Sequence, residues 1–422
     1  MRKMKGKANL AFLVASFILY IMDIISDIYV AFQYYKHGER WWCGITLVFV
    51  LLPHLIINTY AAYINMNFHW YSLRKTVLMW IFQISVLASF KHEFTRWKRE
   101  HWKNRDRERV STRDGQHFTD VTLTMHHTFL RLAEAFAESA PQCCLQIYIM
   151  MRQWHFPWYT VLSSVLSLLS LSWSITSLET SCKTCQWARK TCSTSIKEEK
   201  EIPKISQVMF FVAHLCLLIS RLTSLVIFAY SFRYYVFVIV VIHWLLVFTA
   251  ICMGKKFENS TRINETDIRG RINLTLILNA SLRTYPMVFC LSGSIAKISF
   301  RKKIGRNFGT FALVFYGIFF LENCVMVLLS VFNGTRPHIN HLSKIVLPLM
   351  FVGFSVGVLL LMLYYKCCHP NKLFRRENLE ATDTSLPNEN QGKHQKEIYE
   401  LKDTNCFVNE GTCFKDLESH LI

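Results

Sequence analysis

Residues Ala8–Tyr35 form the apolar segment ANLAFLVASFILYIMDIISDIYVAFQYY, in which Asp23 and Asp27 are the only charged side chains. The segment exceeds the about 20 residues that a helix needs to cross the hydrocarbon core of a bilayer. A bilayer offers no water to backbone N–H and C=O groups, so a spanning segment of this kind must be helical. We therefore predict that Ala8–Tyr35 crosses a membrane.

Seven further segments are long enough, or nearly long enough, to cross a bilayer as a helix. These predicted spans are Cys43–Met66, Phe118–Met151, Trp158–Leu178, Ile205–Phe228, Tyr235–Met253, Phe308–Phe332 and His341–Lys366. Thr76–Phe90 and Ile272–Ile295 are short or interrupted by polar residues, which favours re-entrant or partial helices. The predicted fold is an all-α membrane protein with eight transmembrane helices plus two re-entrant or partial helices.

The composition agrees with this fold class. Of the 422 residues, 52% are hydrophobic and 18% are charged, whereas an ordinary soluble domain has about 25% charged residues. The net charge of +19 comes largely from basic segments between the predicted spans, of which residues 91–117 hold the most Lys and Arg. Short basic loops stay in the cytosol, so an even number of spans places both termini there.

The predicted elements repeat once along the chain. Residues 1–180 hold spans one to four, partial helix 76–90 and basic cytosolic loop 91–117. Residues 205–371 hold spans five to eight and partial helix 272–295. A cytosolic linker rich in Cys and Lys (181–204) joins these pseudo-symmetric halves, and a polar tail predicted to be disordered follows (372–422).

Ionisable residues inside the predicted spans are the next informative feature, because a charge in a bilayer is costly unless it faces protein, water or a partner. Asp23 and Asp27 are four residues apart and share one helical face. Arg131, Glu134 and Glu138 in the third span also share a face. Each set is a candidate for functional polar contacts.

The third span continues from these charges to Pro141, which we expect to disrupt the helix near Gln142. Arg221 and Glu322 are single charges in the fifth and seventh spans. One interpretation is that all these groups form ion pairs that only fix helix packing. The alternative is a polar seam through the bundle, which His54 and Asn58 in the second span would extend.

Signatures of other functions were sought as well. Gly254-Lys255 lacks the first glycine of a phosphate-binding loop, because Thr249 stands there. We predict no enzyme, no cofactor and no nucleic-acid partner, since the basic loops are explained by topology. Cys182 and Cys185 lack a second cysteine pair, so no metal site is predicted. Cys367 and Cys368 follow the last span and are palmitoylation candidates.

The motif LRLAEAFAESAPQ at Leu130–Gln142 resembles the signature of the XK-related family of membrane proteins. Further similar pieces are Ser170–Ser174 (SLSWS), Tyr364-Tyr365 and His369–Asn371 (HPN), so the resemblance spans about residues 8–371. It implies eight spans, two re-entrant helices, pseudo-symmetric halves and cytosolic termini. By resemblance, the polar ladder for lipid headgroups would comprise Asp23, Asp27, Glu134, Glu138, Arg221 and Glu322.

Several members of this family are phospholipid scramblases that expose phosphatidylserine after caspase cleavage. The resemblance therefore implies an ATP-independent scramblase of the plasma membrane, with membrane phospholipids, a caspase and an accessory membrane or lipid-transfer protein as partners. Leu379–Asp383 (LEATD) resembles a caspase site with cleavage after Asp383. The alternatives are a non-scrambling subunit that docks lipid-transfer or peptidase partners, and a small-solute transporter. The sequence predicts no oligomeric state.

Overall fold

The computed structural model describes residues 2–68, 72–102, 113–194, 204–260, 284–290, 308–333 and 339–368. All regular secondary structure in these ranges is helical. The α-helices are α1 (Arg2–Lys36), α2 (Arg40–Phe68), α3 (Leu73–Ile81), α4 (Ser85–Trp102), α5 (Arg113–Gln153), α6 (Trp158–Thr194), α7 (Lys204–Phe232), α8 (Tyr235–Ser260), α12 (Phe308–Asn333) and α13 (Ile339–Leu363). A 3₁₀ turn, η1 (Tyr285–Val288), and a π-helical turn, η2 (Tyr364–Cys368), complete the described elements.

Six described helices are long and apolar enough to cross a membrane: α1, α2, α6, α7, α12 and α13. These six coincide with predicted spans, which confirms the all-α, multi-pass class. The apolar part of α8 is shorter, at Tyr235–Thr249, and α5 contains Arg131, Glu134 and Glu138. The count of eight spans plus two partial helices therefore stays a prediction.

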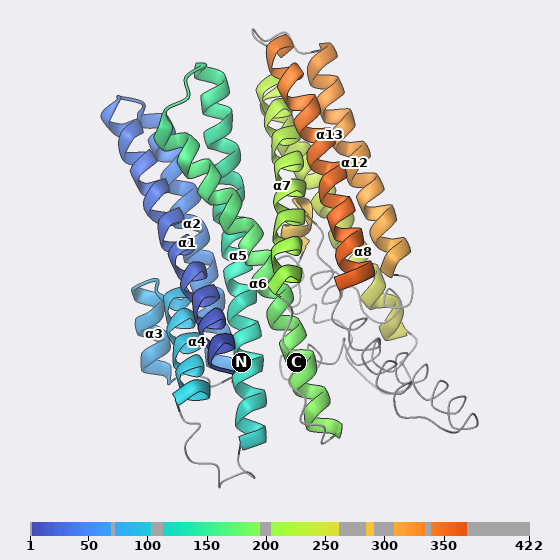
Figure 1. Ribbon diagram of the computed structural model, residues 1–422. Helices are drawn as coiled ribbons and strands as arrows, with labels where there is room; N and C mark the ends of the chain where they lie inside the picture. Colours follow the sequence, from blue (N-terminus) through green and yellow to red (C-terminus); the bar gives the residue numbers. More distant parts are fainter. Residues whose placement is uncertain are drawn as a thin grey trace, which may run out of the picture.

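The helices stand side by side in two groups (Figure 1). The first group contains α1 to α6, and the second contains α7, α8, α12 and α13. Helices α5 and α6 both contact α7, and a buried apolar cluster from Phe136 on α5, Ile175 on α6 and Leu218 on α7 fills this junction. The turns at His37–Glu39, Trp154–Pro157 and Arg233–Tyr234 lie at one end of the bundle (Figure 1).

The structure divides the predicted re-entrant or partial helix at 76–90 into two helices. The chain turns at Phe82–Ile84, which separates α3 from α4, and Gln83 adopts a left-handed φ of 54°. Asn58 of α2 stabilises the turn, because its Oδ1 accepts a hydrogen bond of 2.9 Å from the Ser85 backbone N–H. The resulting hairpin packs against the C-terminal half of α2, where Trp80 Nε1 of α3 also donates to Thr59 Oγ1 at 3.0 Å.

Three other boundaries differ from the sequence prediction. The α5 helix continues through Pro141 to Gln153, so the expected disruption near Gln142 is wrong. The α4 helix extends to Trp102, into the predicted basic loop, and α6 extends to Thr194, into the predicted linker. Residues 272–283, 291–295 and 369–422, which include most of the second partial helix and the tail, lie outside the described residues.

Helices α7 and α13 approach closely along two glycines. A Cβ atom on Gly353 would lie 3.0 Å from the Cys216 carbonyl oxygen, and one on Gly357 would lie 2.7 Å from Leu217 Cγ and 2.9 Å from the Ala213 carbonyl oxygen. This Gly-x-x-x-Gly spacing is typical of membrane helices that pack backbone against backbone.

We expect Gly357→Ala to lower the stability of the protein by about 1–3 kcal/mol, because the added methyl group overpacks the α7–α13 interface. Gly317→Ala on α12 is the matched control, since a Cβ there meets no atom within 4 Å. It should be neutral or stabilising, because Ala favours helix over Gly. Thermal unfolding in detergent would measure both, and equal effects of the two variants would contradict the close packing.

Candidate functional site

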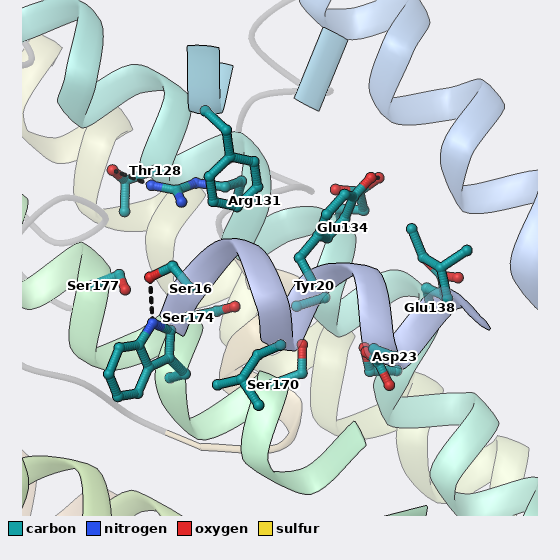
Figure 2. A pocket seen from close by; sticks show the side chains of 16 residues that line it. Ser16, Tyr20, Asp23, Thr128, Arg131, Glu134, Glu138, Ser170, Ser174 and Ser177 are labelled. Atoms are coloured by element: carbon teal, nitrogen blue, oxygen red, sulfur yellow. Dashed lines mark hydrogen bonds between the residues drawn. The ribbon is translucent and has the colours of Figure 1, made fainter. Parts of the chain in front are cut away.

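Polar side chains from α1, α5 and α6 line a partly open cavity of about 30 Å³, which is room for about two water molecules. Figure 2 shows Thr128, Arg131, Glu134 and Glu138 of α5 in one row, with Tyr20 and Asp23 of α1 beside them. The hydroxyl-bearing side chains of the lining are Ser16, Tyr20, Thr128, Ser139, Ser170, Ser174 and Ser177. The cavity is therefore both acidic and rich in hydroxyl groups.

Serine hydroxyls bind both aspartates of α1. Ser139 Oγ of α5 donates to Asp23 Oδ2 at 2.6 Å, and Ser167 Oγ of α6 donates to Asp23 Oδ1 at 2.9 Å. One turn further along α1, Asp27 Oδ1 accepts hydrogen bonds from Ser163 Oγ at 2.6 Å and Gln146 Nε2 at 3.0 Å. Both carboxylates thus link α1 to α5 and α6.

The two glutamates of α5 meet a histidine of α2. His54 Nε2 lies 3.3 Å from Glu134 Oε1, and His54 Nδ1 lies 3.3 Å from Glu138 Oε2. Tyr20 of α1 makes a long hydrogen bond of 3.5 Å to Glu134 Oε1. The acids of this cluster are almost fully buried, with exposures of 5% for Asp23, 1% for Asp27, 2% for Glu134 and 4% for Glu138.

The nearby guanidinium of Arg131 forms no salt bridge with these four acids. Arg131 Nη2 instead pairs with Glu93 of α4 at 2.6 Å, and the guanidinium lies 4.4 Å from the ring centre of Phe90. Among the described residues, no Lys or Arg forms a salt bridge with Asp23, Asp27, Glu134 or Glu138. The first group of helices therefore encloses an excess of acidic groups within a polar cavity.

Arg221 and Glu322 form a separate cluster in the second group. Arg221 is fully buried and donates to Glu322 Oε1 at 3.2 Å, to Asn323 Oδ1 at 2.8 Å and to the Val288 carbonyl oxygen at 3.2 Å. Glu322 Oε2 also lies 2.8 Å from His243 Nδ1 of α8. This cluster ties α7 to α8, α12 and η1 with its charges paired.

The structure brings together only part of the predicted site. Asp23, Arg131, Glu134 and Glu138 line one cavity, whereas Arg221 and Glu322 pair with each other elsewhere. Gln142 is fully buried on α5, and neither polar atom of its amide has a hydrogen-bond partner.

Several partners were missed by the sequence analysis. These are Ser139, Gln146, Ser163, Ser167, Glu93 and His243. A signal for two of them existed, because Ser163 and Ser167 are one helical turn apart on α6, as Asp23 and Asp27 are on α1. The side chains of Cys367 and Cys368 and the whole of Asp383 lie outside the described residues.

Comparison with known proteins gives a family match. A family model for XK-related protein matches residues 11–370. The mouse protein named endoplasmic reticulum membrane adapter protein XK is 22% identical over 86% of this chain and 84% of its own length. Cell death abnormality protein 8 of Caenorhabditis briggsae is 24% identical over 86% of this chain and 78% of its own. XK-related protein 8 of Tetraodon nigroviridis is 20% identical over 86% and 83%.

We expect Arg221→Met to destabilise the protein by about 3 kcal/mol, because it leaves Glu322 without its guanidinium partner. The double variant Arg221→Met/Glu322→Gln removes both charges and should lose less stability than Arg221→Met alone. Thermal unfolding in detergent provides the comparison. A double variant that is less stable than Arg221→Met would contradict the assigned pair.

Proposed function

The chain belongs to the XK-related family, and from that premise we propose that it is an ATP-independent phospholipid scramblase. It would expose phosphatidylserine at the surface of the plasma membrane. The observation that favours this activity is the row of uncompensated acids and hydroxyls along α1, α5 and α6, bordered by a cavity. The name of one relative, cell death abnormality protein 8, fits a role in dying cells.

The barrier to lipid scrambling is the transfer of a polar headgroup through hydrocarbon. Fixed hydroxyl and carboxylate groups lower this barrier because they replace the water around the headgroup. Lipid passage along such groups needs no energy source. The acids of α1 and α5 would attract the ammonium of a headgroup, while the serines of α6 would donate to its phosphate. The acyl chains would stay in the lipid beside exposed apolar residues of α1 such as Ile25 and Phe32.

A second candidate function is a membrane adapter that binds a peripheral protein without moving lipid. The observation that favours it is the similarity to a relative named endoplasmic reticulum membrane adapter protein XK. Reconstitution of the purified protein into vesicles with fluorescent phosphatidylserine distinguishes the two functions, because an adapter would leave the lipid asymmetric. Flux of a small solute without flux of lipid would instead support a transporter.

In that assay we expect Asp27→Asn to lower the scrambling rate about tenfold, which corresponds to about 1.4 kcal/mol in the barrier. The change removes the charge but keeps an oxygen that accepts from Ser163 and Gln146. Ser224→Ala on α7 is the control, because it removes a buried hydroxyl that only bonds the Ser220 carbonyl of its own helix. If both variants scramble like the unaltered protein, Asp27 has no part in the lipid path.

Cleavage of the tail would be the activating step. We expect a chain that ends at Asp383 to scramble faster than the full-length chain, because the LEATD sequence before Thr384 resembles a caspase site. Full-length protein treated with apoptotic extract should gain the same activity, and Asp383→Ala should block the gain. Cleavage that persists in Asp383→Ala would move the site elsewhere.

A further inference from the structure

Three side chains from α2 and α5 have the arrangement of a metal site. One ring nitrogen of His54 and one carboxylate oxygen from each of Glu134 and Glu138 all lie within 4.8 Å of one another. The shortest nitrogen–oxygen distance from His54 to either glutamate is 3.3 Å. Ligand atoms that share a tetrahedral Zn²⁺ at about 2.0–2.2 Å lie about 3.3–3.6 Å apart. A metal ion binds only one nitrogen of an imidazole, and Nδ1 of His54 already lies 3.0 Å from the Val50 carbonyl oxygen, so Nε2 would be the ligand and a rotation of the Glu138 side chain would bring its carboxylate to the same ion.

Unpartnered atoms around the cluster are a second, independent observation. Glu134 Oε2 and Glu138 Oε1 are buried and have no hydrogen-bond partner, and neither do Nε2 and Oε1 of Gln142. Gln142 is fully buried one turn beyond Glu138 on α5, so it shares the same helical face. An unpaired buried carboxylate oxygen is costly, and a bound cation would satisfy these oxygens directly.

The charge balance also favours a cation. In the described part of the chain the two glutamates have no Lys or Arg partner, since Arg131 pairs with Glu93. A divalent ion would neutralise both carboxylates, which the single imidazole of His54 cannot do. We propose that His54, Glu134 and Glu138 bind a divalent transition-metal ion such as Zn²⁺.

The donor set determines the class of ion. An imidazole nitrogen with two carboxylate oxygens suits Zn²⁺ and its neighbours, whereas Mg²⁺ and Ca²⁺ prefer oxygen ligands alone. Three protein ligands leave a fourth tetrahedral position for water. The proposed site is distinct from the cysteine motif at Cys182–Cys185. Metal binding by His54, Glu134 and Glu138 does not depend on whether the chain scrambles lipid.

The competing explanation is an ion pair in which a protonated His54 balances part of the charge of the two glutamates while its Nδ1–H donates to the Val50 carbonyl oxygen. Such a pair would hold α2 against α5 without any metal. The two explanations differ in whether the purified protein takes up Zn²⁺, and this can be measured without a lipid assay.

The test is equilibrium dialysis of the full-length protein in lipid nanodiscs against Zn²⁺ alone, followed by metal analysis. We expect one ion per chain. His54→Gln and Glu138→Gln should each weaken Zn²⁺ binding by more than about tenfold, because even the loss of an outer-shell partner, which does not touch the ion, weakens metal binding by about tenfold. His214→Gln is the matched control, because His214 also lies inside a membrane helix and its Nδ1, like that of His54, lies 3.0 Å from a carbonyl oxygen four residues earlier. It should bind Zn²⁺ normally.

Co²⁺ in place of Zn²⁺ gives a spectroscopic check, because a tetrahedral site produces visible absorption that free Co²⁺ lacks at the same intensity. This absorption should disappear in Glu138→Gln, which keeps the side-chain volume and so tests the site even if His54→Gln does not fold. The proposal is overturned if the unaltered protein binds no more Zn²⁺ than Glu138→Gln. Equal loss in His214→Gln would overturn it as well.

Discussion

The burial of four carboxylates between helices is the constraint on which the first half of the structure depends. Hydrocarbon offers a carboxylate no hydrogen-bond donor, so Asp23 and Asp27 must obtain donors from neighbouring helices. Ser163 and Ser167 supply them from α6, and Gln146 supplies one from α5. These contacts fix the rotation of α1 about its own axis, because only one face of the helix bears the acids.

In the second half of the chain, the buried charged groups obtain their partners in a different way. Arg221 is fully buried, yet each of its nitrogens donates a hydrogen bond, and Glu322 balances its charge. A balanced pair stabilises a packing arrangement but offers little to a charged ligand. The acids beside the cavity are not balanced in this way. Among the described residues the two halves therefore differ in electrostatics, and a site for a cationic group is expected in the first.

Periodicity and charge position sufficed to predict the membrane class, six of the spans and the acidic faces of α1 and α5. The sequence did not predict which residues far apart in the chain form pairs. Arg131 shares a helical face with Glu134 yet pairs with Glu93 of α4. The pair forms because the chain turns between α3 and α4 and α4 then packs against α5. No glycine or proline marks this turn in the sequence. Gln83 takes the left-handed conformation of that turn instead. The serine donors of α6 were also missed, since a serine in a membrane helix most often bonds its own backbone.

A metal ion and a lipid headgroup would use the same acids in different ways. A divalent ion at Glu134 and Glu138 would cancel the charge of these two residues and leave Asp23 and Asp27, which serine and amide donors hold in place. The remaining attraction for an ammonium group would then be confined to the part of the cavity next to α1. Metal occupancy would accordingly weaken headgroup binding near α2, so an ion at this position would act as an inhibitor of lipid passage and not as a part of its path.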